Sequence, residues 1–226
     1  MTFAEKVIHF YTQLDYRGPL PSGISIMNPF SGNPDVVNIV REFYSRFFND
    51  THPRFIILGI NPGRFGAGIT GITFTDTIRL NEKCGIVFKK FKTYEPSSAF
   101  VYDMIDAYGG VVDFYRKFFV SAVCPLGFTM MNDKGRAVNY NYYDSAVLLK
   151  MVYPFILESL RKQIGFGIDT SVCYCLGTGR NEQFLHQIND EHHFFEKIIA
   201  LEHPRYIMQY KAKRKQDYIR KYLEVL

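Results

Sequence analysis

Residues 54–77 read RFIILGINPGRFGAGITGITFTDT, and this stretch decides the fold of the chain. Its apolar start, residues 55–58, is typical of a buried strand in a parallel sheet. The strand ends at Gly59, and Asn61-Pro62-Gly63 predicts a sharp turn directly after it. A polar residue at the carboxyl end of such a strand lies where open α/β sheets bind ligands, and glycines let the backbone come close to one. The stretch therefore predicts a ligand-binding loop, although a plain glycine-rich connection between a strand and a helix explains the glycines as well.

Three more apolar runs predict strands, and helical patterns separate them. We expect these strands at residues 118–124, 171–176 and 197–201. Helices are expected at residues 3–14, 33–47, 97–107, 143–164 and 180–188, and in the tail. Because strands that alternate with helices form a parallel sheet between helical layers, the predicted fold is α/β, a three-layer α/β/α sandwich with a central four-stranded parallel sheet. We expect one domain over residues 1–226, with a helical N-terminal extension at 1–50 and a basic C-terminal helix at 203–226.

Several local signals refine this prediction. Asn33 and Ser97 are the expected caps of their helices, and Pro154 is expected to kink or break the helix that contains it. Residues 16–32 are expected to form a loop. Asp133-Lys134-Gly135 predicts a turn within the polar stretch 129–142.

Polar side chains fall at the carboxyl ends of all four expected strands. Asn61, Ser121, Arg180 and His203 lie at or just after these ends. In a parallel sheet the carboxyl ends share one edge, so four distant segments are expected to meet in one cleft.

Composition narrows the class of protein. The chain has 226 residues, which is enough for a domain with a sizeable core. No apolar run approaches the ~20 residues that cross a bilayer, and the amphipathic N-terminus does not resemble a signal peptide. The cysteines at 84, 124, 173 and 175 form no C-x-x-C pair. We therefore expect no metal site, no membrane partner and a reducing compartment, the cytoplasm.

Charge is concentrated at the C-terminal end. Residues 203–226 hold seven basic and two acidic side chains, so this segment accounts for the +5 net charge of the whole chain. Such a run forms either a solvated helix face or a surface that binds phosphates. Charge alone does not decide between the two.

The residues also exclude several familiar chemistries. No Lys follows the glycines as a Walker loop requires, and the Asn-Pro-Gly turn does not match a dinucleotide fingerprint. No G-x-S-x-G elbow, metal-binding His pair or pair of carboxylates at the strand ends is found. What remains is Asn, His, glycines, two Phe that offer stacking surfaces and a basic tail.

These residues carry a resemblance to a known family. Residues 59–66 (GINPGRFG) and 70–74 (TGITF) resemble the first active-site motif of the single-strand-selective monofunctional uracil-DNA glycosylases, a group of the uracil-DNA glycosylase superfamily. Residues 119–126 (FVSAVCPL), 177–183 (GTGRNEQ) and 203–205 (HPR) follow in the order of that family. The chain looks like a divergent, bacterial-type member. The resemblance implies a monofunctional DNA glycosylase of base excision repair, which hydrolyses the N-glycosidic bond of a flipped, deaminated base.

The resemblance also implies roles for individual residues. Asn61 would position the attacking water, and His203 would stabilise negative charge on the departing base. The residues expected to bind the base are Ile60, Pro62, Gly63, Phe74, Ser121 and Ala122, with Phe74 as the stacking ring. The residues expected to bind DNA are Arg205, Tyr206, Ile207, Met208, Lys211, Lys213 and Arg214. The expected partner is DNA containing damaged bases, bound by a monomer without a cofactor or metal.

The chain departs from the family at one important position. Ala122 stands where the family carries an Asn that reads the pyrimidine edge, and Ala cannot hydrogen-bond a base. Uracil is therefore the first candidate substrate, and a roomier pocket for xanthine or hypoxanthine is a second hypothesis. The missing Asn also leaves open a catalytically inactive nucleic-acid-binding protein on the same fold. A third alternative is an enzyme that acts on a free nucleoside.

Overall fold

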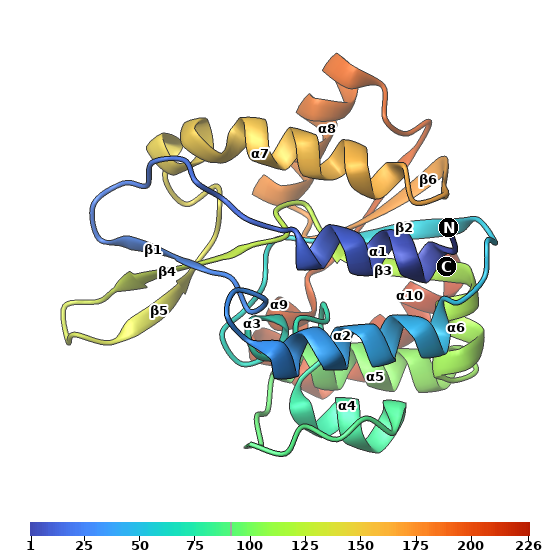
Figure 1. Cartoon of the computed structure of the whole chain (residues 1–226). Helices are drawn as coiled ribbons and strands as arrows, with labels where there is room; N and C mark the ends of the chain where they lie inside the picture. The colour runs from blue at the N-terminus through green and yellow to red at the C-terminus, as the bar shows by residue number, and fades with distance from the viewer. Residues whose placement is uncertain (91) are drawn as a thin grey trace.

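Strand β2 (Arg54–Gly59) lies in the middle of a parallel sheet, as its apolar sequence predicts (Figure 1). The structure is a computed structural model that describes residues 1–90 and 92–226. Within these residues the sheet has four strands in the order β3-β2-β6-β7, and every pair is parallel. The other three strands are β3 (Phe118–Ala122), β6 (Ile168–Leu176) and β7 (Ile198–Leu201). The predicted parallel sheet is confirmed.

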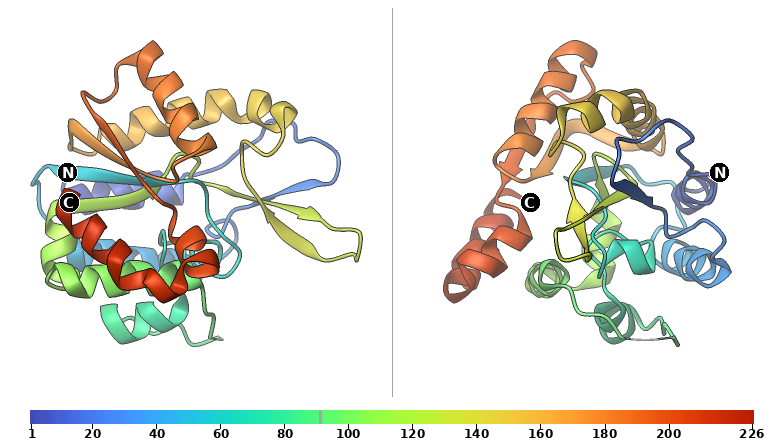
Figure 2. Two further views of the ribbon diagram at one scale, coloured as in Figure 1. Left: turned by 180° about the vertical axis from the view of Figure 1, so that it is seen from behind. Right: turned by 90° about the vertical axis from the view of Figure 1, so that its left-hand side faces the viewer.

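Successive residues of each strand point to opposite faces of the sheet, and both faces are apolar. Helices therefore cover both faces. On one face the ring of Phe119 packs against Phe3 of α1 (Phe3–Thr12), with ring centroids 5.3 Å apart. On the other face Phe118 packs against Tyr108 of α5 (Pro96–Tyr108) at 5.5 Å. Helix α7 (Ala146–Ile164) lies on the side of α1, and α10 (Lys215–Val225) lies on the side of α5 (Figure 2). This arrangement is the predicted three-layer sandwich.

The remaining helices flank these layers. They are α2 (Pro34–Phe47), α3 (Ala67–Thr70), α4 (Thr77–Cys84), α6 (Val111–Lys117), α8 (Arg180–His192), α9 (Pro204–Tyr210) and the 3-10 helix η1 (Ala212–Arg214). The expectation of a single basic helix over 203–226 is wrong, because α9, η1 and α10 divide that segment. In the described chain no helix has both the length and the apolar character needed to span a bilayer.

A second sheet was not predicted. Strands β1 (Ile24–Met27), β4 (Gly127–Met131) and β5 (Ala137–Tyr140) form an antiparallel sheet that projects from the body of the molecule (Figure 1). Strand β1 lies within residues 16–32, which were expected to form a loop between the helices of the N-terminal extension. The turn predicted at 133–135 is confirmed, and the Asn132 side chain fixes it by accepting the N–H groups of Lys134 and Arg136.

Three local expectations are not met in full. Helix α5 begins at Pro96, so Ser97 is buried in its first turn and does not cap it. Asn33 occupies the cap position of α2, but its side chain makes no capping hydrogen bond. Helix α7 continues through Pro154 without a break.

Candidate active site

The carboxyl ends of the parallel strands meet at one edge, as predicted. Gly59 is paired with Ala122, and Leu176 is paired with Leu201. Beyond these ends lies a cleft of about 570 Å³. Its walls come from residues 59–65 of the glycine loop, from the start of α5, from the β5 side of the projecting sheet and from α9. Asn61, Phe74, Ala122 and His203 all line it, so the structure brings together residues that lie far apart in the sequence.

The side chain of Asn61 is held in one orientation by the segment that follows β5. Its amide nitrogen donates to the carbonyl of Tyr140 at 3.2 Å, and its oxygen accepts the backbone N–H of Tyr142 at 3.1 Å. The amide oxygen has two lone pairs, so one remains for another donor. Asn61 is therefore a rigid acceptor at the wall of the cleft.

Phe74 provides an aromatic wall in a strained conformation. Its φ of +53° is unusual for a residue with a side chain and costs on the order of 1–3 kcal/mol. The buried hydroxyl of Thr70 holds the turn by donating to the carbonyl of Thr75 at 2.6 Å. The ring lies so close to Gly59 that a Cβ there would be 2.9 Å from its Cε2 atom. Glycine at this position therefore lets the ring lie at the end of β2.

His203 faces the same space, with its ring centroid 5.6 Å from that of Phe74. It caps α9, and its Nδ1 atom accepts the backbone N–H of Arg205 at 3.1 Å. Because Nδ1 is an acceptor, the proton of the neutral ring lies on Nε2. Burial and the nearby charge of Arg205 lower the pKa of His203 to about 4. At neutral pH the residue is therefore an uncharged hydrogen-bond donor.

Glu95 is a cleft residue that the sequence reasoning missed. It precedes α5, and its backbone N–H donates to the carboxylate of Asp76 at 2.8 Å. Burial and the charge of Asp76 raise the pKa of Glu95 to about 7, although Arg205 acts in the opposite direction. No motif marks this residue, and only its place before a helix that starts near the cleft could have suggested it.

The projecting sheet supplies two further residues that were missed, Asn139 and Asn141. The side-chain oxygen of Asn139 accepts the backbone N–H of Arg64 at 3.0 Å, which ties β5 to the glycine loop. Both residues lie in the polar stretch 129–142, for which only a turn was predicted. The sheet that positions them had to be predicted before they could be recognised.

Two predicted site residues are fully buried and do not line the cleft. Ser121 is fully buried, and its hydroxyl shares a hydrogen bond with the hydroxyl of Tyr11 on the opposite face of the sheet. Successive strand residues face opposite sides, so Ala122 faces the cleft and Ser121 does not. Ile207 is also fully buried and packs into the core. The structure therefore contradicts direct contact of either residue with a base or DNA.

The other predicted contacts on α9 remain accessible. Arg205 and Met208 line the cleft, while Tyr206 is 43% exposed and Tyr210, which was not predicted, is 65% exposed. The rings of these two tyrosines lie 5.6 Å apart. Together they form an exposed aromatic surface on α9, the helix whose Arg205 and Met208 line the cleft.

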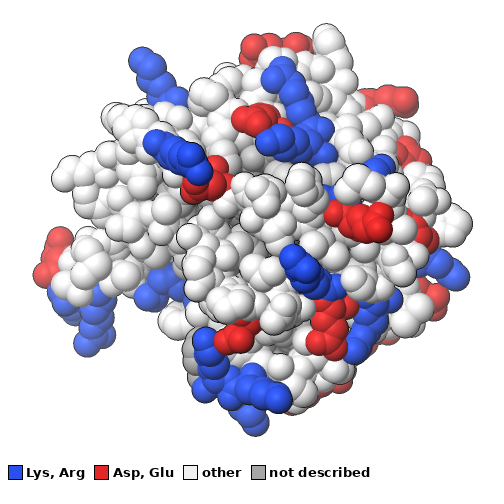
Figure 3. Space-filling model, in the orientation of Figure 1, with Lys and Arg blue, Asp and Glu red and all other residues white. Residues whose placement is uncertain are grey.

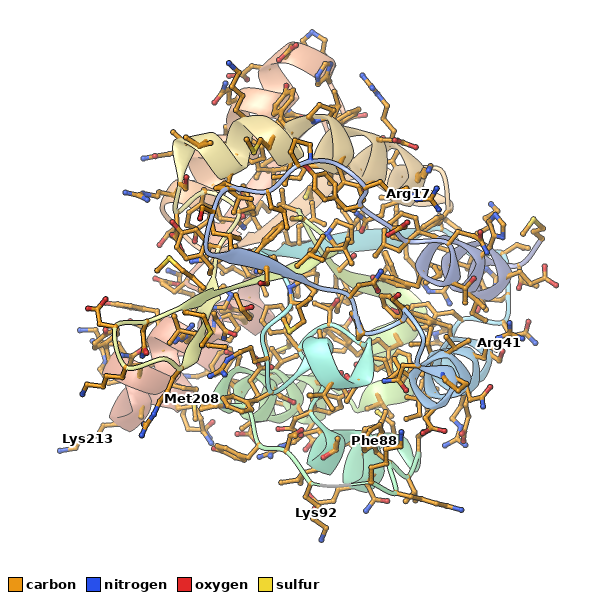
Figure 4. The ribbon with its side chains drawn as sticks, turned by 60° about the vertical axis from the view of Figure 1, so that its left-hand side comes forward. Arg17, Arg41, Phe88, Lys92, Met208 and Lys213 are labelled. Carbon is orange, nitrogen blue, oxygen red and sulfur yellow. The ribbon has the colours of Figure 1, made fainter. Side chains whose placement is uncertain are left out.

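Four of the seven basic side chains of the tail form ion pairs. Arg214 pairs with Asp217, as does Arg220, while Lys215 pairs with Asp103 and Lys221 with Glu202. Among the described residues, Arg205, Lys211 and Lys213 have no such partner. Lys213 extends outward on the side of the molecule that carries Met208 (Figure 4). Elsewhere basic and acidic side chains are interspersed, as the face in Figure 3 shows.

Arg180, which was expected in the cleft, does not line it. Its guanidinium donates to the carbonyl of Tyr143 at 3.4 Å.

Within residues 1–90 and 92–226, no three His, Cys, Asp or Glu side chains gather in a way that could hold a metal ion.

The chain is similar to known proteins in both sequence and structure. The sequence model of the Uracil DNA glycosylase superfamily matches residues 45–226. The crystal structure of wild-type SMUG2 from Pedobacter heparinus matches with a TM-score of 0.97 and 53% sequence identity. This match covers 100% of the present chain and 97% of that chain. The comparison with curated proteins finds no match.

Proposed function

Because the chain belongs to the uracil-DNA glycosylase superfamily, we propose that it hydrolyses the N-glycosidic bond of a damaged base extruded from DNA. Uracil is the first expected substrate, and the product is an abasic site for base excision repair. The observation that carries the assignment of residues is the meeting of Asn61, Phe74 and His203 in one cleft, with the polar groups of Asn61 and His203 already oriented.

Phe74 is the proposed stacking surface for the extruded base. Extrusion from a duplex costs a few kcal/mol, and stacking on an aromatic ring returns about 1–3 kcal/mol per base. The ring is held by the strained turn and by its contact with Gly59, so little ordering remains to be done when the base arrives.

His203 is the proposed stabiliser of the departing base. As the bond between the sugar and the base breaks, the sugar gains positive charge and the base becomes an anion. A fixed donor near that anion is the kind of interaction that contributes most to catalysis. Neutral His203 supplies such a donor at Nε2, because Nδ1 already accepts from Arg205.

Asn61 is the proposed holder of the attacking water. Its free lone pair can accept one hydrogen of that water and direct the water oxygen toward the sugar. An amide is a very weak base, but a cationic sugar requires only a weak one. This route needs neither a pair of carboxylates nor a Lys nucleophile.

DNA is proposed to lie across the mouth of the cleft. Arg205, Lys211 and Lys213 are the basic residues of the tail without ion-pair partners among the described residues, so they are the proposed phosphate contacts. Tyr206, Met208 and Tyr210 are the candidates to fill the gap that the extruded base leaves. Arg214 is expected to contribute less because Asp217 already pairs with it.

Ala122 favours a second group of substrates. Its methyl side chain lines the cleft and takes little space beside the base. Xanthine and hypoxanthine are larger than uracil, and a cleft of about 570 Å³ has room for a purine. We therefore propose that these deaminated purines are also excised.

An activity panel tests the proposal. The protein is incubated with single- and double-stranded oligonucleotides that carry uracil, xanthine or hypoxanthine, and abasic sites are then cleaved with alkali. We expect strand cleavage only after alkali, no trapping of a covalent intermediate by borohydride, and equal rates with and without EDTA. Size-exclusion chromatography is expected to show a monomer. Binding to every oligonucleotide without release of any base would instead indicate an inactive nucleic-acid-binding protein.

A further inference from the structure

Glu95 is a half-buried acid in the cleft that the mechanism above does not use. Its side chain does not cap α5, although it stands at the cap position. Within residues 1–90 and 92–226, its carboxyl oxygens take part in no hydrogen bond or ion pair. Because Glu95 lines the cleft, these oxygens are free to bind a group that enters it.

The glycine loop is shaped around this carboxyl group. A Cβ atom at Gly66 would lie 2.0 Å from one carboxyl oxygen, and a Cβ at Gly63 would lie 2.7 Å from the other. Any side chain at these two positions would push Glu95 out of its place. The loop that carries Asn61 and the carboxyl group of Glu95 therefore form one continuous wall.

The surroundings keep a substantial fraction of Glu95 protonated at neutral pH. The charged and titratable groups on the elements around it are Asp76, Arg79, Arg64, Arg205 and His203. Asp76 is fully buried and pairs with Arg79 at 3.3 Å. Burial and Asp76 raise the pKa of Glu95 to about 7, and Arg205 opposes this shift without forming an ion pair with it. A neutral carboxylic acid is a hydrogen-bond donor, which an ionised carboxylate is not.

We propose that Glu95 contacts the extruded base and, as a neutral acid, donates a hydrogen bond to one of its carbonyl oxygens. This inference rests on the proposed function. Deamination replaces an amino group by a carbonyl group in uracil, xanthine and hypoxanthine alike, and only the carbonyl accepts a hydrogen bond. Ala122 offers no such donor from its side of the cleft. The departing base is also negative, so an ionised Glu95 would repel it whereas the neutral acid stabilises it.

Single-turnover excision of uracil tests the role of Glu95 with three variants. Glu95→Gln keeps an N–H donor of similar size and is expected to remain within a few-fold of the wild-type rate. Glu95→Ala removes the donor to a developing negative charge and is expected to be about 10- to 100-fold slower. Glu82→Gln, which changes an exposed acid on α4, is the matched control and is expected to leave the rate unchanged.

Two further readouts separate this role from others. The wild-type rate is expected to fall as pH rises above about 7, while Glu95→Gln lacks that fall. Glu95→Ala is expected to bind DNA with an abasic site as tightly as the wild type, because no base is present to contact. Thermal unfolding of each variant shows that it is folded.

The inference is overturned by any of three results. Glu95→Ala excises uracil as fast as the wild type, or it binds abasic DNA more weakly. Alternatively, Glu95→Gln is as slow as Glu95→Ala and the wild-type rate rises with pH, which identifies a general base instead. Each of these leaves the proposed function standing if the wild-type protein is active. A wild-type protein that excises no base contradicts the proposed function itself, and this inference with it.

Discussion

The ionisation of His203 makes a quantitative prediction about stability. Burial and Arg205 lower its pKa in the folded protein from 6.5 to about 4. In the unfolded chain the imidazole binds a proton as pH falls below 6.5, whereas in the folded protein it does not. The unfolded state therefore gains protons first, and the free energy of unfolding decreases with acidity. With these two pKa values the loss is about 2 kcal/mol at pH 5 and approaches about 3 kcal/mol below pH 4.

His203→Asn isolates this contribution. Asn is a good residue at a helix cap, and its side-chain oxygen can accept the Arg205 N–H that Nδ1 accepts in the wild type. The variant therefore removes the titrating group and keeps the start of α9. Denaturant unfolding of both proteins between pH 4.5 and 8 gives the difference in their free energies of unfolding, in which all other titrating groups cancel.

We expect this difference to change by about 2 kcal/mol between pH 8 and pH 5, with the wild type losing more stability. Two curves that run parallel over the whole range would refute the reasoning. That result would mean that His203 titrates normally and becomes charged in weak acid, so a neutral donor at Nε2 would no longer describe the site.

Three further perturbations test separate parts of the account. Gly59→Ala would bring a Cβ within 2.9 Å of the Phe74 ring. We expect this variant to lose about 1–3 kcal/mol of stability in denaturant and to excise uracil markedly more slowly. An unchanged rate would argue against stacking on this ring. Because its pKa is raised from 4.5 to about 7, Glu95 destabilises the fold increasingly as pH rises through that interval. Above pH 8 this lowers the free energy of unfolding by about 3 kcal/mol, and Glu95→Gln should remove that loss. An identical pH dependence of unfolding in both proteins would contradict the shift. Lys213→Gln should reduce the slope of log K against log salt for DNA binding by about 1. Lys221 is paired with Glu202, so Lys221→Gln should leave the slope unchanged. Equal slopes for the two variants would exclude a phosphate contact at Lys213.

The parallel sheet could be predicted from the sequence because two of its strands, β2 and β3, are buried on both faces. Such strands are continuous apolar runs, so β2 and β3 are evident without any knowledge of their neighbours. Strand β1 has only four residues and exists because it pairs with β4, which lies far along the chain. Pairing of that kind leaves no local signal, and the projecting sheet was therefore missed.

Site residues could be predicted where their position at the end of a strand determines that they reach the cleft. Asn61 and His203 follow strand ends and were found for that reason, while Ser121 was misplaced because a shift of one residue changes the face of the sheet. Ile207 was misplaced because the rotation of a short helix determines which of its side chains is buried. Glu95 was missed because its role depends on a carboxyl group that reaches the glycine loop through space.

Asn61 and His203 are proposed to form the reacting centre of this glycosylase. Single-turnover excision of uracil from a single-stranded oligonucleotide, measured for the wild type, Asn61→Ala and His203→Asn at pH 7.5, tests it most directly. We expect each variant to be slower by about 100-fold or more, as is usual when one fixed hydrogen-bonding group of an active site is removed, while affinity for abasic DNA is retained. Wild-type rates in both variants would contradict the claim and would place the chemistry elsewhere in the cleft.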